Sequence, residues 1–286
     1  MRGERLMVRM MGMPEHQYAL GVIGSGHIAG IIVRRLIDSG YLAGDRILMT
    51  ESRNLEAHPL PVRTTRDAGE VLHTARIVML SVTPQKFAEV AASLRPLASA
   101  DPIYLSVMAG VETRRIAEAL GAGDVRVVRA MPNLPFSLGR GVTGLCRGER
   151  ATADDVEEVR HLFNAGGVSV VLDDENLMDA VTAVAGSGPA YFYYFVEMMM
   201  EGGVAAGLKP EDAQVLAAHA CVGAGAMLLE RDASPKELRE AVTSPGGTTQ
   251  AAMDTLAESK VAIHVRDAVL AAFERGRQLG RMAGQP

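Results

Sequence analysis

The chain has 286 residues, of which 48% are hydrophobic and 22% are charged, and its formal net charge is −5. This composition is typical of a soluble globular protein, and the length predicts two domains. The acidic balance gives no electrostatic reason to expect nucleic acid or an anionic membrane as a partner. Cys146 and Cys221 lie far apart and without metal-ligand spacing, so we expect neither a zinc site nor a disulfide, and a cytoplasmic location.

Residues 1–17 carry charges among their apolar residues and lack the continuous apolar segment of a signal peptide. We expect them to form a flexible extension. The longest apolar run, residues 215–229, is shorter than a membrane span and predicts a buried helix.

Residues 18–40 have the pattern of a buried strand, a glycine-rich turn and an amphipathic helix. Gly24 would allow a tight turn, Gly26 would let a pyrophosphate approach the backbone, and Ala29 would let the helix pack closely on the strand. This GxGxxA pattern predicts dinucleotide binding at a helix N-terminus. The alternative is a tight turn between strand and helix that binds nothing.

Further strand candidates follow at helix-sized intervals, in the segments RILMTES, RIVMLSV, PIYLSVMAG and VRVVRAMPN. Repeated strand and helix units predict an α/β fold, a Rossmann-type doubly wound parallel sheet over residues 18–172. Small or polar residues end these strands at 81–84, 107–110 and 131–133, and they would line one crevice at the carboxyl edge of the sheet. Taken singly, each of these segments could be an ordinary loop.

The preference between NAD and NADP should be encoded after the second strand, in the segment MTESRN. Glu51 favours NAD because a carboxylate binds ribose hydroxyls, whereas Thr50, Ser52 and Arg53 favour the 2′-phosphate of NADP. The register of these residues is not fixed by the pattern, so both cofactors remain open.

From residue 173 to residue 286 the pattern is almost entirely helical. Pro189 lacks a backbone donor, so the Gly-Ser-Gly-Pro segment at 186–189 predicts a kink or a restarted helix. This break either opens space against a nicotinamide ring or lets two helices pack closely. Further helices are predicted over 210–230, after a capping box at Ser234 and Glu237, after Thr248, and over 261–279.

The helices between residues 177 and 230 are apolar on nearly every side and rich in Ala, Gly and Met. A single chain offers too little apolar surface to cover them, so we predict an intertwined homodimer through this domain. The stripe YFYYFVEMMM is interpreted as core and interface rather than as a ligand site.

The segment SPGGTT at 244–249 places small and hydroxyl residues directly before a helix. Its backbone N–H groups and hydroxyls would lie at the positive end of that helix, which is a suitable site for a small carboxylate.

The motifs VTSPGGTTQAAM, TAVAGSGPAYF, VRAMPN and GVIGSGHIAG together resemble pyrroline-5-carboxylate reductase over residues 19–278, and the SPGGTT segment is the most specific of the four. The resemblance implies a Rossmann domain, a helical dimerisation domain often assembled into rings of dimers, and reduction of 1-pyrroline-5-carboxylate to L-proline by NADPH or NADH. It implies that Thr249 hydrogen-bonds the imine nitrogen and supplies its proton. The implied substrate-binding residues are Glu175, Ser244, Gly246, Gly247, Thr248 and Thr249.

The cofactor-binding residues follow from the dinucleotide pattern and from this resemblance together. They are Gly24, Ser25, Gly26, His27, Ile28, Ala29, Glu51, Ser52, Arg53, Ser81, Val82, Thr83, Pro84, Val107, Met108 and Ala109. Imine reduction needs a positioned hydride donor and a weak acid, so no metal is expected.

The chain departs from the family pattern at three positions, with Thr83 in place of lysine, Leu134 in place of threonine and Ala68 in place of asparagine. These departures leave two alternatives open, a reductase of a bulkier imine and a non-catalytic NAD(P)-binding protein. The β-hydroxyacid dehydrogenases have a similar architecture but use a lysine on the first central helix. This chain has no lysine between Lys86 and Lys209, which argues against that class of enzyme.

Overall fold

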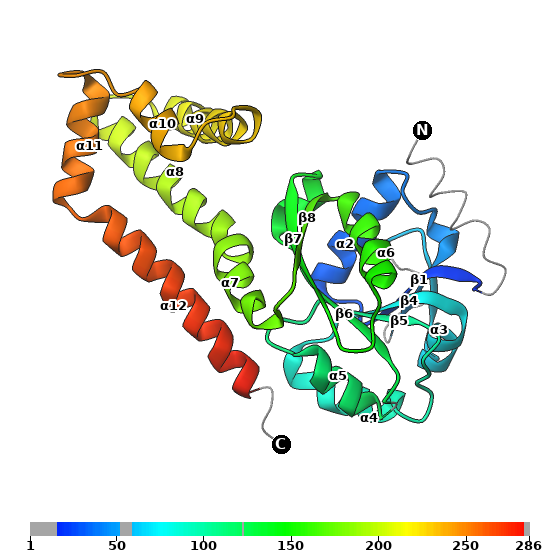
Figure 1. The fold of residues 1–286 in the computed structure, drawn as a ribbon. Coiled ribbons are helices and arrows are strands. Elements are labelled where there is room, and N and C mark those ends of the chain that lie inside the picture. The colour runs from blue at the N-terminus through cyan, green and yellow to red at the C-terminus, as the bar shows by residue number, and fades with distance from the viewer. Residues whose placement is uncertain (1–15, 52–58, 122, 283–286) are drawn as a thin grey trace. The chain divides into compact units, whose positions relative to one another are not determined.

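The computed structural model describes residues 16–51, 59–121 and 123–282 (Figure 1). The chain forms two compact units. The sheet unit contains the chain up to Gly186 and again from Phe273 onward, and the helical unit contains Ser187–Ala272. The predicted boundary at 172/173 lies earlier than this division and remains a prediction. The expected flexible extension lies outside the described residues except for His16 and Gln17, and the His16 ring is 3.0 Å from a carboxylate oxygen of Asp101.

One eight-stranded sheet forms the centre of the sheet unit, in the order β3-β2-β1-β4-β5-β6-β7-β8. All neighbouring strands run parallel except β6 and β7, so β7 and β8 run opposite to the rest. The predicted α/β fold with a parallel-dominated sheet is thereby confirmed. The strands are β1 (Tyr18–Ile23), β2 (Ile47–Thr50), β3 (Arg63–Thr65), β4 (Ala75–Leu80), β5 (Ile103–Ser106), β6 (Arg126–Met131), β7 (Gly141–Arg147) and β8 (Gly167–Leu172).

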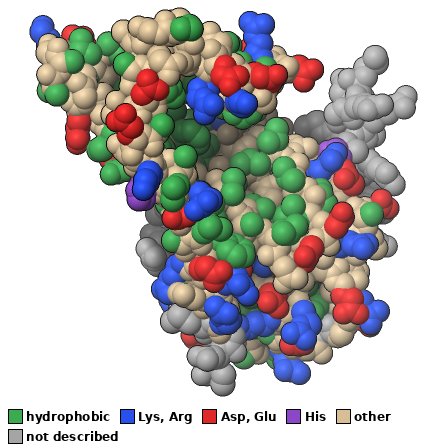
Figure 2. Space-filling model, turned by 60° about the vertical axis from the view of Figure 1, so that its left-hand side comes forward, with side chains coloured by type: hydrophobic (Ala, Val, Ile, Leu, Met, Phe, Trp, Pro, Cys, Tyr) green, Lys and Arg blue, Asp and Glu red, His purple; other side chains and the backbone are tan. Residues whose placement is uncertain are grey.

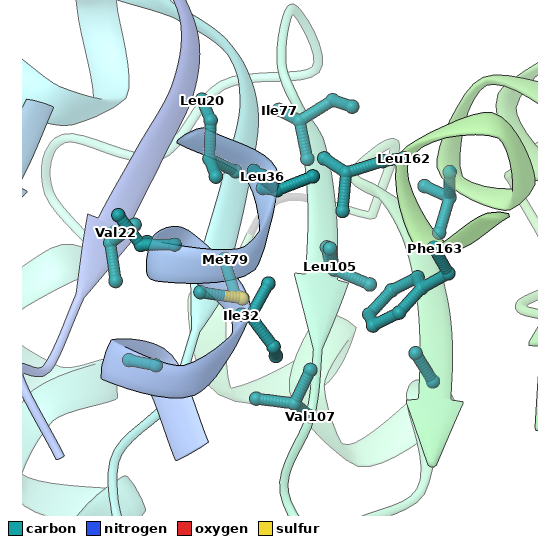
Figure 3. Close-up of a cluster of buried hydrophobic side chains, with 14 of the residues drawn as sticks. Leu20, Val22, Ile32, Leu36, Ile77, Met79, Leu105, Val107, Leu162 and Phe163 are labelled. Carbon is teal, nitrogen blue, oxygen red and sulfur yellow. The ribbon is translucent and has the colours of Figure 1, made fainter. Parts of the chain in front are cut away.

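Helices cover both faces of this sheet, as a doubly wound arrangement requires (Figure 1). One face carries α2 (His27–Asp38) and α6 (Ala153–Asn164), and the other carries α3 (Ala68–Thr74), α4 (Phe87–Leu94) and α5 (Thr113–Leu120). Successive residues of a strand point to opposite faces, so Ile77 and Met79 belong to one apolar cluster and Val78 to the other. Figure 3 shows Ile32 and Leu36 of α2 and Leu162 and Phe163 of α6 meeting the strand residues of the first cluster.

A connector leads out of the sheet unit through a 3-10 turn at Glu175–Leu177, the short helix α7 (Met178–Val181) and a π-helical turn at Thr182–Gly186. Other 3-10 turns are Gly44–Arg46, Pro84–Lys86 and Leu134–Leu138. A new helix, α8 (Gly188–Ala205), begins directly after the connector with Pro189 in its first turn. The predicted restart of the helix at this Gly-Pro segment is confirmed.

The helical unit continues through α9 (Pro210–Glu230), α10 (Pro235–Ala241), α11 (Thr248–Glu258) and α12 (Val261–Met282), whose final turns belong to the sheet unit. The predicted capping box starts α10, because Ser234 Oγ accepts from the Glu237 backbone N–H at 3.2 Å and the Ser234 backbone N–H donates to Glu237 Oε2 at 2.7 Å. The Ser234 hydroxyl also donates to Glu237 Oε2 at 2.7 Å. This bond first, and the bond from the Ser234 backbone N–H second, hold the pKa of the Glu237 carboxyl below its usual value.

Large apolar side chains are exposed along the helical unit, and Figure 2 shows hydrophobic side chains on the surface of both units. The prediction of a buried helix at 215–229 is wrong for one chain, because only 11% of the most apolar stretch of α9 is buried. By length and composition alone, α9 is the described helix that could cross a membrane. Exposed residues on α8 and α9 include Phe192, Tyr193, Tyr194, Met199, Leu216, Val222 and Leu229. One chain therefore lacks the cover that these helices need.

Candidate functional site

In the glycine-rich turn after β1, the backbone conformation at position 24 requires glycine. Its φ is +99°, and a Cβ atom there would lie 2.8 Å from the Ser81 carbonyl oxygen. Thr50, at the end of β2, holds the turn, because its Oγ1 accepts from the Gly24 N–H at 3.0 Å and donates to the Val22 carbonyl at 3.3 Å. The sequence pattern relates Thr50 only to cofactor choice, and it does not predict that this side chain holds the turn.

Helix α2 starts at this turn with an open N-terminus. Gly26 is its N-cap, and in the described part of the chain no side chain caps it and its first turn holds no acidic residue. A Cβ atom at Gly26 would meet only the Ser81 carbonyl oxygen, at 3.7 Å, so no described protein atom forbids a side chain there. Ser25, Gly26 and His27 are exposed, while Ala29 is fully buried against the sheet. The unpaired N–H groups of a helix end and its positive dipole favour a phosphate at this position.

The loops after β4 and β5 lie beside this turn, because β1, β4 and β5 are neighbours in the sheet. The Ser81 N–H donates to the Ile23 carbonyl at 2.9 Å, and the Val107 N–H donates to the Leu80 carbonyl at 3.2 Å. The Ser81 hydroxyl is buried and has no hydrogen-bond partner among the described residues. The structure thus brings together the predicted segments 24–29, 81–84 and 107–109, with Val82 half-buried, Thr83 exposed and Met108 buried.

Of the residues expected to determine the preference between NAD and NADP, only some lie in the described part of the chain. Glu51 is half-buried after β2, and its backbone N–H donates to the Thr65 carbonyl at 2.9 Å. Ser52 and Arg53 lie outside the described residues, so the register at the ribose stays a prediction. At the Ala68 departure, Asp67 caps α3 by accepting from the Gly69 N–H at 2.8 Å.

Asn133 fastens the end of β6 to the connector. Its Oδ1 accepts from the Val142 N–H at 3.0 Å, and its Nδ2 donates to the Ala185 carbonyl in the π-helical turn at 3.1 Å. The side chain is 8% exposed, so both bonds lie in a largely dry environment. Leu134, the next residue and one of the family departures, is 49% exposed.

Glu175 is bound within the sheet unit by two partners. Its Oε1 accepts from the Thr113 N–H at 2.9 Å and from Arg129 Nη1 at 3.2 Å, and its Oε2 accepts from the Thr113 hydroxyl at 2.6 Å. The Arg129 side chain is 5% exposed and also lies 4.0 Å from Asp179 of α7. The carboxylate therefore joins the start of α5, the middle of β6 and the connector.

Cys146 lies opposite Arg129 across the β6 and β7 pair. Burial raises the pKa of its thiol, and the nearby Glu175 carboxylate raises it further. The thiol is therefore protonated and unreactive at neutral pH.

The SPGGTT segment begins α11 in the helical unit, as predicted. Gly246 has φ +72°, and the Gly247 N–H donates to the Ser244 carbonyl at 3.0 Å, which closes a turn before the helix. Gly247 is the N-cap, and among the described side chains none caps α11 and none in its first turn is acidic. Ser244 and Thr248 are exposed and Thr249 is half-buried. The open helix end offers N–H groups and two hydroxyls to an anion.

In residues 16–51, 59–121 and 123–282, no cluster of His, Cys, Asp and Glu side chains could hold a metal ion.

Comparison with known proteins identifies the family. Residues 175–279 match the pyrroline-5-carboxylate reductase dimerisation family, and residues 19–110 match the family of NADP oxidoreductases described as coenzyme F420-dependent. A pyrroline-5-carboxylate reductase from Synechocystis sp. is 36% identical, over 92% of this chain and 98% of its own. This chain belongs to the pyrroline-5-carboxylate reductase family.

Solved structures agree with this family assignment. A pyrroline-5-carboxylate reductase from Coxiella burnetii is 32% identical, with a TM-score of 0.84 over 92% of this chain and 99% of that chain. The Plasmodium falciparum pyrroline carboxylate reductase, solved with NADP bound, has the same TM-score of 0.84 over 93% of this chain and 99% of that chain. Its 24% identity supports the shared fold alone. The reductase family assignment thus covers both the sheet unit and the helical unit.

Proposed function

We propose that this chain reduces 1-pyrroline-5-carboxylate to L-proline with NADPH or NADH, the last step of proline biosynthesis. Family membership over nearly the whole chain carries this conclusion. The intact open helix ends at Gly26 and Gly247 supply the two anion-binding features that a dinucleotide and an amino-acid carboxylate need.

The sheet unit contains residues suited to the dinucleotide. The α2 N-terminus would hold the pyrophosphate, the glycine at position 26 leaves the backbone accessible, and the unpartnered Ser81 hydroxyl can bond a polar group of the ligand. When bound, the reduced nicotinamide supplies a hydride to the imine carbon. The assigned residues are Gly24 to Ala29, Glu51 with Ser52 and Arg53, Ser81 to Pro84, and Val107 to Ala109.

The helical unit contains residues suited to the substrate. The backbone N–H groups at the start of α11, with Ser244 and Thr248, bind the carboxylate. The Thr249 hydroxyl donates a hydrogen bond to the imine nitrogen and transfers its proton there as the hydride reduces the C=N double bond to a single bond, and water returns a proton to the Thr249 oxygen. Thr249 is half-buried at the start of α11.

Glu175 acts as a positioning residue for the substrate-binding residues of the helical unit. Both of its carboxylate oxygens already accept hydrogen bonds from Thr113 or Arg129, so its contribution is to fix the connector that leads to the helical unit. A contact with the substrate is not required for this role.

The apolar faces of α8 and α9 are proposed to be covered by a second copy of the chain. The dimerisation family spans these helices, so a homodimer, further assembled into a ring, provides the missing cover. A cytoplasmic location without membrane or nucleic-acid partners agrees with this arrangement, since the second copy rather than lipid would cover α9.

Steady-state oxidation of NADPH and of NADH, measured in parallel with 1-pyrroline-5-carboxylate as acceptor and with L-proline identified as product, tests the function. We expect turnover, and the ratio of the two kcat/KM values identifies the preferred cofactor. Nucleotide binding without turnover would contradict the proposal. A bulkier cyclic imine accepted in place of pyrroline-5-carboxylate would instead assign the chain, with its departures at Thr83 and Leu134, to another substrate.

A further inference from the structure

The last turns of α12 return to the sheet unit and contact the segment that follows β5. A Cβ atom on Gly280 would lie 2.9 Å from the Gly110 carbonyl oxygen, and a Cβ atom on Gly110 would lie 2.9 Å from the Gly280 backbone nitrogen. The two backbones therefore touch directly, with no side chain between them. This approach is possible only because both residues are glycine.

Gly110 is the residue directly after Val107, Met108 and Ala109, the loop assigned to the cofactor. Its φ of +72° turns the chain away from β5 toward α5. Two residues after Val111, the Thr113 N–H and hydroxyl are both held by Glu175. The segment after β5 is thus fixed at one end by Gly280 and at the other by Glu175.

The order of the strands indicates which half of a dinucleotide this loop would meet. The adenosine ribose is recognised at the end of β2, and the pyrophosphate binds between the two halves at the turn after β1. Since β4 and β5 lie on the other side of β1 from β2, the nicotinamide half extends toward the loop at 107–109.

We infer that Gly280 is a positioning residue for the nicotinamide half of the cofactor, because its backbone contact with Gly110 sets the place of the 107–109 loop. This inference rests on the proposed function. It extends the cofactor site to the final turns of α12, which lie far from the Rossmann motifs in the sequence.

The variant Gly280→Ala tests the contact, and Gly276→Ala is its matched control one turn earlier on the same helix. Both changes give the same gain in helix propensity. The new methyl group meets the Gly110 backbone at 2.9 Å in Gly280→Ala, but at Gly276 its nearest neighbour is the end of the Asp179 side chain, at 3.4 Å. Only Gly280→Ala should displace the loop.

The measurements are calorimetric dissociation constants for the reduced dinucleotide that the wild type uses and for its fragment without nicotinamide, ADP-ribose or its 2′-phosphate. We expect Gly280→Ala to weaken binding of the dinucleotide, to leave binding of the fragment unchanged, and to lower kcat/KM by about 10- to 100-fold. We expect Gly276→Ala to change none of these, and both variants to keep the wild-type melting temperature.

Unchanged dinucleotide binding in Gly280→Ala would overturn the inference, and so would an equal loss of dinucleotide and fragment or an equal effect of Gly276→Ala. A drop in melting temperature together with the loss of both ligands would show a merely structural role and would overturn it as well. Failure of the wild type to form proline is a separate result, which rejects the proposed function.

Discussion

Thr249 is the side chain that we propose as the proton donor to the imine nitrogen. We predict that Thr249→Ala lowers kcat by about 100-fold or more, since a positioned acid contributes at least this factor, while the dissociation constant for NAD(P)H stays the same. Thr249→Ser should restore most of the activity. The control Thr248→Ala should raise the KM for pyrroline-5-carboxylate with a smaller effect on kcat. Equal losses of turnover and of nucleotide binding in Thr249→Ala would remove Thr249 from this role.

Glu175 is the anionic partner of a nearly buried arginine. We predict that Glu175→Gln lowers the free energy of unfolding by about 1–3 kcal/mol, because Arg129 then lacks its closest charged acceptor and one of the two oxygens that accept from Thr113 becomes an N–H donor. Urea unfolding at fixed protein concentration measures the change. Glu157→Gln is the control, because its ion pair with Arg160 is exposed and should contribute about 1 kcal/mol or less. Equal effects of the two changes would contradict this prediction.

Cys146 should be inert in the native protein because burial raises the pKa of its thiol from the ordinary value of 9.0. The protonated form is favoured in the folded state, so the stability from this group is present at neutral pH and is lost as the pH rises through the folded pKa. We predict that a Cys221→Ser protein reacts with a thiol reagent at pH 8 only after urea unfolding. Rapid labelling of the native protein would show that the thiol is accessible.

Among the structural elements, the π-helical turn at Thr182–Gly186 depends on one amide side chain. We predict that Asn133→Asp lowers the free energy of unfolding by about 1–3 kcal/mol, because the aspartate still accepts from the Val142 N–H but leaves the Ala185 carbonyl without its donor. Asn164→Asp is the control, since Asn164 is exposed and its Oδ1 can still accept from Ser169. A faster proteolytic cut near residue 186 in Asn133→Asp would support the same conclusion. Equal stability of the two variants would contradict it.

The elements that the sequence predicted correctly are those with local signals. The strand, turn and helix around Gly24 were predicted from residues within one segment, and so were the capping box at Ser234 and the start of α11. β3 was missed because it is short and polar, and β7 and β8 were missed because they depend on pairing with distant residues.

The candidate site shows the same limit. The residues at the carboxyl ends of β1, β4 and β5 could be predicted, because the rule for parallel sheets places them at one edge. The partners of Glu175 lie 62 and 46 residues away along the chain, and Gly110 and Gly280 are separated by more than half of the chain. No local sequence pattern predicts such contacts, because they depend on how distant segments pack.

At the scale of the whole molecule, the exposed apolar surface of the helical unit makes folding depend on association. We predict that Phe192→Asp on α8, where the ring is 60% exposed in one chain, shifts the protein from dimer to monomer and lowers its melting temperature. Leu138→Asp, at a leucine 78% exposed on the sheet unit, is the control and should leave the dimer intact. Sedimentation velocity over a range of concentrations measures both. A stable Phe192→Asp dimer would contradict the proposed interface.

The chain completes the sheet unit only after it has built the helical unit, since α12 returns to Gly110 from beyond residue 272. During synthesis the ribosome releases the sheet strands first and the final turns of α12 last. A nascent chain can therefore form its nucleotide fold and gather its helices while Gly110 is still uncovered. The packing of Gly280 against Gly110 would therefore be the last step that completes the sheet unit of the newly synthesised enzyme.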